Sequence, residues 1–386
     1  MRKVPGTVWA LGLVSLFMDV SSELVHSLLP VFMTSVLGAS MVSVGLVEGV
    51  AEATASIVKV FSGALSDRLS RRKPLLVLGY GLAALAKPLF PLAGSVALVL
   101  GARFLDRIGK GIRGAPRDAL IADITPRESR GTAYGLRQAL DTVGAVLGPL
   151  AAIALMLALS SNIRSVLWLA FAPAIVSVAV LLLLVREPPV LQHGNERASW
   201  RSIGALPRHY WAVVALGAVL TLARFSEAFL ILRAQDASIA LAFVPIVLVV
   251  MNVVYTAVAY PAGVAADRGA RRALLLSGLA ALIASDLLLA ASASPSALFA
   301  GVALWGVHMG LTQGLLATLV ADASPASLRG TGFGVFNLVS GVALLAASLI
   351  AGWLWASYGA AATFCAGAAF TTVALLGLVR MTNRGG

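Results

Sequence analysis

Positively charged side chains gather in one stretch of the chain, GARFLDRIGKGIRGAPRDALIAD, residues 101–123. If this stretch is a helix, four of its cations fall within about 80° of one another: Arg103, Arg107, Lys110 and Arg117. Such a row can hold an anionic group of a small molecule through charge-assisted hydrogen bonds. A further cation, Arg137, lies at a similar depth in the next apolar segment. We therefore expect Arg107, Lys110 and Arg137 to bind substrate.

Carboxylate side chains that could carry a proton lie in the neighbouring apolar segments. Asp19 and Glu23 are four residues apart, so they share one face of a helix. A carboxylate in a cavity of low dielectric can take up and release a proton during a transport cycle. The predicted proton-coupling residues are Asp19, Glu23, Glu52 and Asp141. The alternative is that they are permanent ion-pair partners of the cations and only fix the helices in register.

The second half of the chain offers fewer charged side chains for this chemistry. Arg224 and Glu227, three residues apart in one apolar segment, are the predicted substrate-binding residues of this half. Asp286 stands alone in the sequence, and we expect it to be structural. Coupling to protons is therefore expected in the first half.

The elements that must position these side chains are membrane helices. Of the 386 residues, 59% are hydrophobic and 12% are charged, and the mean hydropathy is +0.92, which excludes a soluble globular domain. Each apolar run can cross a hydrocarbon core of roughly 30 Å as a helix of about 20 residues. Open sheets are excluded because lipid cannot satisfy backbone amides. We predict an all-α membrane protein with twelve transmembrane helices, at residues 8–34, 42–66, 74–93, 95–121, 131–159, 164–185, 211–233, 239–265, 273–292, 295–321, 331–357 and 360–380.

The net charge of +12 reflects membrane topology. Arg and Lys concentrate in alternate loops, which by the positive-inside rule places both termini in the cytoplasm. We therefore expect a multi-pass monomer of the inner (cytoplasmic) membrane, embedded in the lipid bilayer, with no nucleic-acid partner. The first apolar run lacks a small-residue cleavage site and is expected to remain as a span. The single cysteine, Cys365, excludes an intrachain disulfide and a cysteine metal site.

Two motifs occur twice along the chain. GALSDRLSRR at residues 63–72 returns as GVAADRGARR at 263–272, an offset of 200. ADITPRESRGTAYG at 122–135 returns as ADASPASLRGTGFG at 321–334, an offset of 199. Two matches at nearly one offset indicate two six-helix bundles in parallel orientation, which is typical of transporters that rock about a central site. The predicted domains are an N-terminal bundle at 1–185, a cytoplasmic linker at 186–210 and a C-terminal bundle at 211–386.

These repeated motifs make the chain resemble the major facilitator superfamily over essentially its full length. The first loop motif is similar to the family pattern G-x-x-x-D-[RK]-x-G-[RK]-[RK], with Ser70 in place of the second glycine. The resemblance implies a cytoplasmic gate in which Asp67 pairs with cations near the cytoplasmic end of residues 101–123. The gating residues that it implies are Asp67, Arg68, Arg71, Arg72, Arg113, Arg117, Asp267 and Arg268.

The fifth apolar segment carries a helix-packing motif. It resembles the pattern of family members that export by antiport: Gly135, Gly144, Gly148 and Pro149. Ala152 and Ile153 replace the closing glycine pair of that pattern. Apart from the resemblance, glycines in a membrane helix permit close packing, and Pro149 permits a kink. The resemblance implies a transporter similar to drug/proton antiporters.

We predict a secondary active transporter, not an enzyme, that exports an organic small molecule by proton antiport. The cations favour a substrate that is anionic or a metal chelate. The alternative is a proton symporter that imports an organic anion or a siderophore-like chelate. A membrane-embedded enzyme or a receptor is disfavoured, because no H-E-x-x-H or P-loop motif is present and neither class needs two matched gates. The proton gradient is the expected energy source, with no cofactor and no metal.

Overall fold

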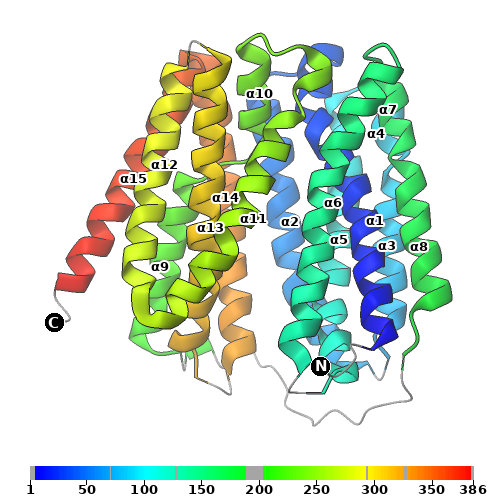
Figure 1. The fold of residues 1–386 in the computed structure, drawn as a ribbon, viewed down its shortest axis with the longest axis vertical. Coiled ribbons are helices and arrows are strands. Elements are labelled where there is room, and N and C mark those ends of the chain that lie inside the picture. Colours follow the sequence, from blue (N-terminus) through cyan, green and yellow to red (C-terminus); the bar gives the residue numbers. More distant parts are fainter. Residues whose placement is uncertain are drawn as a thin grey trace. The chain divides into compact units, whose positions relative to one another are not determined.

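The fold was obtained as a computed structural model, which describes residues 5–69, 71–126, 129–187, 203–204, 206–292, 294–325 and 328–383. Within these ranges, nothing is described for the side chains of residues 64, 67, 68, 267, 317, 329, 330 and 380–383. The described chain is helical and contains no β-strand (Figure 1). The prediction of an all-α protein is confirmed.

The chain divides into two compact units. Their segments are Met1–Leu37 and Val50–Glu196 for unit 1, and Gly38–Gly49 and Arg197–Gly386 for unit 2. One boundary therefore falls inside a helix, α2 (Met41–Arg68). The predicted linker at 186–210 includes residues 188–202 and 205, which lie outside the described part of the chain. The predicted domain limits accordingly stay a prediction.

Each unit consists of long helices with a few shorter pieces. Besides most of α2, unit 1 holds α1 (Gly6–Val31), the π-helical turn η1 (Phe32–Val36), α3 (Lys73–Ala86), α4 (Leu89–Leu92), α5 (Val96–Ile124), α6 (Arg130–Ala158), α7 (Ile163–Leu169) and α8 (Phe171–Leu184). Unit 2 holds α9 (Arg208–Ala223), α10 (Ala228–Asp236), η4 (Leu241–Phe243), α11 (Ile246–Ala265), η5 (Ala266–Ala270), α12 (Arg271–Ala291), α13 (Pro295–Ala323), α14 (Arg329–Tyr358) and α15 (Ala360–Asn383).

Most of these helical segments can cross a membrane. In the described ranges, eleven are long and apolar enough to do so. The predicted span at 95–121 corresponds to α5, whose 29 residues include eight charged side chains. Several predicted spans are interrupted: 74–93 is divided between α3 and α4, 164–185 between α7 and α8, 211–233 between α9 and α10, and 239–265 between η4 and α11. The chain is a multi-pass membrane protein, as predicted.

The internal repeat is visible in the helix limits. α13 begins and ends 199 residues after α5. Both helices start after a serine whose hydroxyl accepts a backbone hydrogen bond, Ser95 from Leu98 N at 3.4 Å and Ser294 from Ala297 N at 3.3 Å. A serine N-cap satisfies one of the amide groups left without a partner at a helix start. The same capping residue thus fixes the same helix start in both units.

A repeated ion pair corrects the alignment of the two loop motifs. Arg72 Nε lies 2.7 Å from Asp123 Oδ2 in unit 1, and Arg271 Nη1 lies 2.7 Å from Asp322 Oδ2 in unit 2. Both pairs are therefore related by an offset of 199. The sequence motifs alone align Arg72 with Arg272, at an offset of 200. The structural equivalent of Arg72 is Arg271, one residue earlier.

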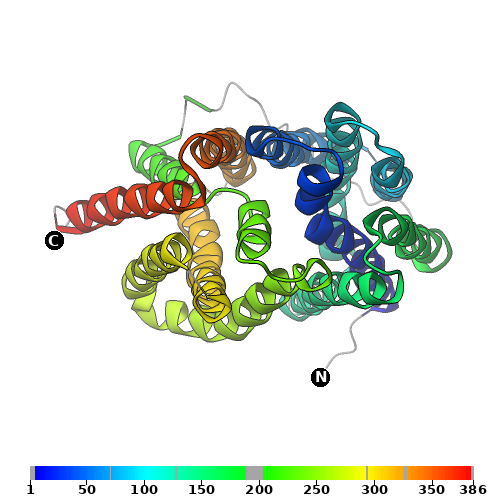
Figure 2. The same cartoon turned by 90° about the horizontal axis from the view of Figure 1, so that it is seen from above.

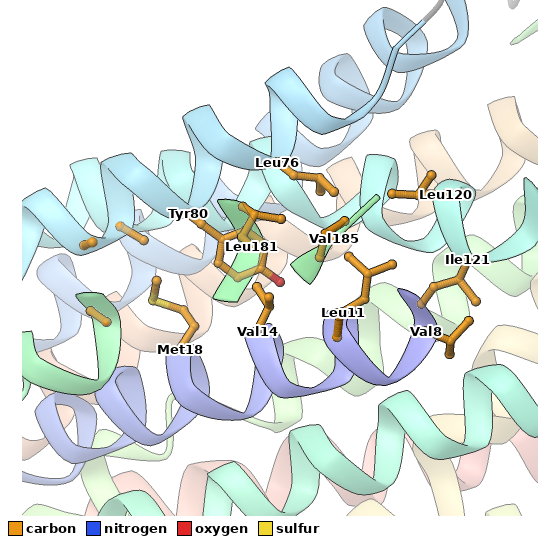
Figure 3. Close-up of a cluster of buried hydrophobic side chains, with 14 of the residues drawn as sticks. Val8, Leu11, Val14, Met18, Leu76, Tyr80, Leu120, Ile121, Leu181 and Val185 are labelled. Atoms are coloured by element: carbon orange, nitrogen blue, oxygen red, sulfur yellow. The ribbon is translucent and has the colours of Figure 1, made fainter. Parts of the chain in front are cut away.

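The core of unit 1 lies where α1, α3, α5 and the end of α8 meet (Figure 3). α1 contributes apolar side chains at helical spacing, so they form one stripe: Val8, Leu11, Val14 and Met18. They pack against Leu76 and Tyr80 of α3 and against Leu120 of α5. Seen from above, the dark blue α1 lies beside α6 and α8 (Figure 2). The core thus fixes α1 against the helices that carry most of the charged side chains.

Candidate functional site

The interface between α1 and α6 brings the helix-packing motif to the predicted proton-coupling residues. A Cβ atom added at Gly144 would lie 2.9 Å from the Cβ of Asp19, and one added at Gly148 would lie 2.7 Å from the Cβ of Glu23. Only glycine permits so close an approach, which is how small residues act between membrane helices. Pro149 is buried inside α6. Gly135 has no described atom within 4 Å of the place of a Cβ, so no packing contact explains this glycine.

The carboxylates of Asp19 and Glu23 are half-buried. Neither makes a hydrogen bond or an ion pair in the part of the chain that the structure describes. Asp19 nevertheless lies within electrostatic reach of Arg113, Arg117 and Asp141. Asp19 is therefore placed beside cations that have other partners, and Glu23 lies one helical turn further along α1.

Those partners form a cluster on α5 and α6, here called the α5–α6 ion cluster: Arg117, Asp118, Arg137 and Asp141. Asp118 Oδ1 lies 3.3 Å from Arg117 Nε and 3.0 Å from Arg137 Nη1. Asp141 lies 3.8 Å from Arg117 and 3.3 Å from Arg137. Arg117 also donates to Ser15 Oγ on α1 at 2.7 Å. Each arginine thus bridges two carboxylates, and Arg117 ties the cluster to α1.

A second, more deeply buried group joins α3, α5 and α2, and is called the α3–α5 ion network: Lys87, Asp106, Arg107 and Glu52. Lys87 Nζ donates to Asp106 Oδ1 at 2.8 Å and to Ser22 Oγ of α1 at 2.9 Å. Arg107 Nη2 lies 3.1 Å from Glu52 Oε1 and Arg107 Nε lies 4.0 Å from Asp106 Oδ2. Two residues predicted for different tasks, Glu52 and Arg107, are therefore partners of each other.

Two cations close to these ion pairs have exposed side chains. Lys110 of α5 and Lys59 of α2 both have exposed side chains, and neither makes an ion pair within the described ranges. Arg113, by contrast, is buried over the ring of Tyr80, 4.6 Å from the ring centre. Arg103 is buried as well, with Nη2 2.7 Å from His26 Nδ1. Of the row of cations predicted in residues 101–123, Lys110 is the one that offers an accessible charge.

The predicted gating residues are only partly described. The side chains of Asp67, Arg68 and Asp267 lie outside the described part of the structure. Arg71 and Arg268 are exposed. Arg72 is 5% exposed and donates to Asp123 Oδ2 at 2.7 Å and to Ser66 Oγ at 2.6 Å.

The chain around Arg72 is tied to the segment after α8. The carboxylate of Glu187 accepts hydrogen bonds from the backbone N–H groups of Arg72 and Lys73. Both N–H groups belong to the start of α3, where a carboxylate is favoured by the helix dipole. This contact anchors the beginning of the predicted linker to unit 1.

In unit 2 the two predicted substrate-binding residues flank a break in the helix. α9 ends at Ala223 and α10 begins at Ala228, so Arg224 and Glu227 stand at the interruption. Ser226 Oγ accepts a hydrogen bond at 3.2 Å from the N–H of Ala228, the first residue of α10. Interrupted helices at membrane depth are tolerated where protein or a cavity surrounds them.

Sequence reasoning missed the two aspartates that organise the charged groups of α5. Asp106 pairs with Lys87, and Asp118 joins Arg117 to Arg137. A signal was available, because on a helix both aspartates fall within about 60° of Arg103 and so share the cationic face. In the described ranges, no group of three or more His, Cys, Asp or Glu side chains is placed to hold a metal ion.

Comparisons with known proteins agree on one family. A sequence profile of the Major Facilitator Superfamily matches residues 11–232 and 228–384. An uncharacterized MFS-type transporter of Methanocaldococcus jannaschii is 34% identical over 364 residues, which covers 92% of this chain and 89% of the relative. The multidrug resistance protein MdtH of Yersinia enterocolitica is 31% identical over 127 residues, 33% of this chain and 31% of that protein. The solved structure of the nucleoside transporter NupG (D323A mutant) is similar with a TM-score of 0.81 and 14% identity, over 97% of this chain and 99% of that chain.

Proposed function

The chain belongs to the major facilitator superfamily and is a membrane transporter, not an enzyme, and we propose that it exports an organic small molecule in exchange for protons. The observation that carries this proposal is the position of Asp19 and Glu23. Both are half-buried on α1 where it packs against α6, Asp19 lies within electrostatic reach of the α5–α6 ion cluster, and neither has an ion-pair partner among the described residues. A carboxylate so placed can bind a proton in one step of the cycle and lose it in another.

The antiport mechanism follows from competition. Arg117 and Arg137 are already neutralised by Asp118 and Asp141, so a substrate that donates hydrogen bonds or carries positive charge would be held by Asp19 or Glu23. A proton on the same carboxylate removes that interaction. Substrate and proton therefore occupy the site in turn, which is the requirement for exchange. The export direction is supported by the similarity to MdtH and by Gly144 and Gly148, which match the antiporter-like motif.

A second candidate is proton-coupled import of an organic anion, and the charge balance of unit 1 favours it. When all are ionised, the charged groups of this region carry a net charge of +1: Lys59, Lys110, Arg113, Arg117 and Arg137 against Asp19, Glu23, Asp118 and Asp141. One bound proton raises this positive charge further. The exposed ammonium of Lys110 could hold the anion, so the proton and the anion would bind together. Joint binding is the requirement for symport.

The two candidates predict opposite effects of pH on substrate binding. Compounds that stabilise the purified protein against heat would first be identified among organic cations, organic anions and metal chelates. The affinity for each would then be measured at acidic and at alkaline pH. Competition with a proton predicts weaker binding at acidic pH, whereas joint binding predicts stronger binding. Binding that does not change with pH would contradict both.

Coupling is tested with neutral replacements in proteoliposomes. Asp19→Asn and Glu23→Gln should keep the exchange of labelled substrate at equal concentrations but lose accumulation driven by a pH gradient. Asp236→Asn, which removes an exposed carboxylate of α10, is the matched control and should behave as the wild type. Gradient-driven accumulation at the wild-type level in the double variant would refute the proposed proton carriers. If the substrate proves to be an anion, Lys110→Gln should weaken its binding by about 1.5–3 kcal/mol.

A further inference from the structure

We propose that unit 1 carries a binding site for an acidic phospholipid, at the place where the end of α8 meets the start of α3. Lys73 and Arg186 hold the phosphate of the lipid, and its acyl chains lie against exposed leucines of α8. The inference rests on the packing of the two helix ends, on a hydrogen-bond donor of Lys73 that is not used, and on the order of leucines and cations along the chain. This site uses no residue of the transport proposal above.

The ends of α3 and α8 are fixed against each other by apolar packing. Leu76 of α3 and Leu181 and Val185 of α8 are buried in the core of unit 1 (Figure 3). The three leucines between the two buried residues of α8, at positions 182–184, are 50%, 77% and 54% exposed. Because α8 lies in a membrane span and lipid tails are as apolar as leucine, these exposed side chains contact acyl chains. The last turn of α8 thus has one side in the core and one side in lipid.

Lys73 is held over this end of α8. Its Nζ donates to the carbonyl oxygen of Leu182 at 3.2 Å and to that of Val185 at 2.7 Å. A cation is favoured there, because the last carbonyl groups of a helix lack partners within the helix. An ammonium group has three N–H donors, so one donor remains for a ligand. Among the described residues Lys73 makes no ion pair. The lysine is therefore positioned by α8 and is still able to bind an anion.

Arg186 lies beside Lys73. It follows the end of α8 at Leu184 by two residues, and its side chain is exposed. Both of its neighbours in the chain contact Lys73: Val185 through its carbonyl oxygen, and Glu187 through a carboxylate oxygen that lies 3.2 Å from the backbone N of Lys73. Within the described ranges the guanidinium of Arg186 makes no hydrogen bond and no ion pair. Two cations from different helix ends therefore meet at one place.

The described cations at this place outnumber the carboxylates. Arg71 is exposed as well, and the neighbouring pair of Arg72 with Asp123 is neutral in sum. Glu187 therefore stands against three cations, Arg71 and the two that hold the phosphate. Basic residues directly beyond a spanning helix attract anionic lipids, and each is worth about fivefold in affinity. The positive-inside rule predicts that this end of unit 1 faces the cytoplasm, and the cytoplasmic leaflet carries the negative surface potential.

A phospholipid suits this place better than a soluble anion. The exposed leucines at 182–184 end just before Arg186, so the boundary between hydrocarbon and headgroups falls between them. The phosphate of a lipid lies at this boundary, because it joins the acyl chains to the headgroup. There it can accept charge-assisted hydrogen bonds from Lys73 and Arg186. A soluble anion has to approach from water and gains nothing from the leucines.

Native mass spectrometry of the full chain tests the site by resolving the binding of single lipid molecules. Dioleoyl phosphatidylglycerol serves as the acidic lipid, and dioleoyl phosphatidylcholine as a zwitterionic lipid with the same acyl chains. Wild-type protein should bind its first phosphatidylglycerol at least tenfold more tightly than phosphatidylcholine. Arg186→Gln, which removes no contact of the described structure, should lower this preference about fivefold. Arg208→Gln, which removes an exposed cation at the start of α9 in unit 2, is the matched control and should leave the preference unchanged.

Lys73→Gln tests the second cation. It should lower the lipid preference about fivefold, and it should also lower the melting temperature in either lipid, because α8 loses two hydrogen bonds at its end. Equal binding of the two lipids to the wild type, or a preference that is unchanged in Arg186→Gln, would overturn the proposal. An equal loss in Arg208→Gln and Arg186→Gln would show a diffuse attraction without a site and would overturn it too. Release of the bound lipid by an equal concentration of glycerol phosphate would show a site for soluble anions, which also contradicts it.

Discussion

The buried pair of Lys87 and Asp106 allows a test of how unit 1 tolerates its charges. The two side chains are 1% and 4% exposed, and Lys87 Nζ also donates to Ser22 Oγ at 2.9 Å. Removing one member of a buried pair typically costs about 3–5 kcal/mol, because the other charge is left uncompensated. Replacing both members by apolar side chains is often neutral. The prediction therefore concerns three variants: Lys87→Met, Asp106→Asn and the double variant Lys87→Met with Asp106→Leu.

The structure predicts that the two single variants are unequal. In Lys87→Met, Asp106 keeps a cation nearby, because Arg107 Nε is 4.0 Å from its Oδ2. The cost should lie at the lower end, about 3 kcal/mol. In Asp106→Asn, Lys87 and Arg107 both lose their shared carboxylate, and only Arg107 retains another acid, Glu52. The cost should then approach about 5 kcal/mol.

Thermal unfolding in detergent measures these differences. For a unit of this size, each kcal/mol corresponds to roughly 2–4 °C, so the single variants should melt about 6–20 °C below the wild type. Asp106→Asn should be the lower of the two, and the double variant should lie within a few degrees of the wild type. A double variant as unstable as Asp106→Asn would refute the reasoning, because the loss would then come from packing and not from an unpaired charge.

Two further predictions concern the glycines of α6 and the repeated ion pair. Gly144→Ala should destabilise unit 1 by about 1–3 kcal/mol through overpacking against α1, whereas Gly135→Ala should leave the melting temperature unchanged, since no described atom lies within 4 Å of its Cβ position. Arg72→Ala should cost at least about 2 kcal/mol, because this buried guanidinium makes several charge-assisted hydrogen bonds. Arg271→Ala should cost about 0–1 kcal/mol, because its side chain is 42% exposed; equal losses in both would contradict this.

The large features of the fold were predictable because they depend on properties that the sequence displays directly. Hydropathy runs located the spans, and repeated motifs indicated two matched halves. The loop motifs repeat at an offset of 200, but the ion pair that they supply repeats at 199, because Arg271 and not Arg272 contacts Asp322. The break between α9 and α10 was missed, because residues 224–227 contain neither glycine nor proline to signal it.

The sequence predicts which face of a helix the charged side chains occupy, but it does not predict which side chains form ion pairs with one another. Helical periodicity places Arg107 and Lys110 on one side of α5, and their role as substrate ligands stays a prediction. It cannot show that Arg107 is occupied by Glu52 while Lys110 remains exposed, because that depends on the position of α2. Asp286 was read as structural from its isolation in the sequence. In the described structure Asp286 is fully buried and neither of its oxygens has a hydrogen-bond partner, and its structural role stays a prediction.

The interruption between α9 and α10 gives the two units different mechanical properties. α1, the first span of unit 1, is one helix of 26 residues, whose hydrogen bonds resist bending along its length. The first span of unit 2 consists of two shorter helices, α9 and α10, joined by residues 224–227. α10 is hydrogen-bonded to the end of α12 through Arg233, so a displacement of α9 can be absorbed as a rotation at residues 224–227. The two repeated units thus differ at their first span, which is one continuous helix in unit 1 and two helices that can rotate against each other in unit 2.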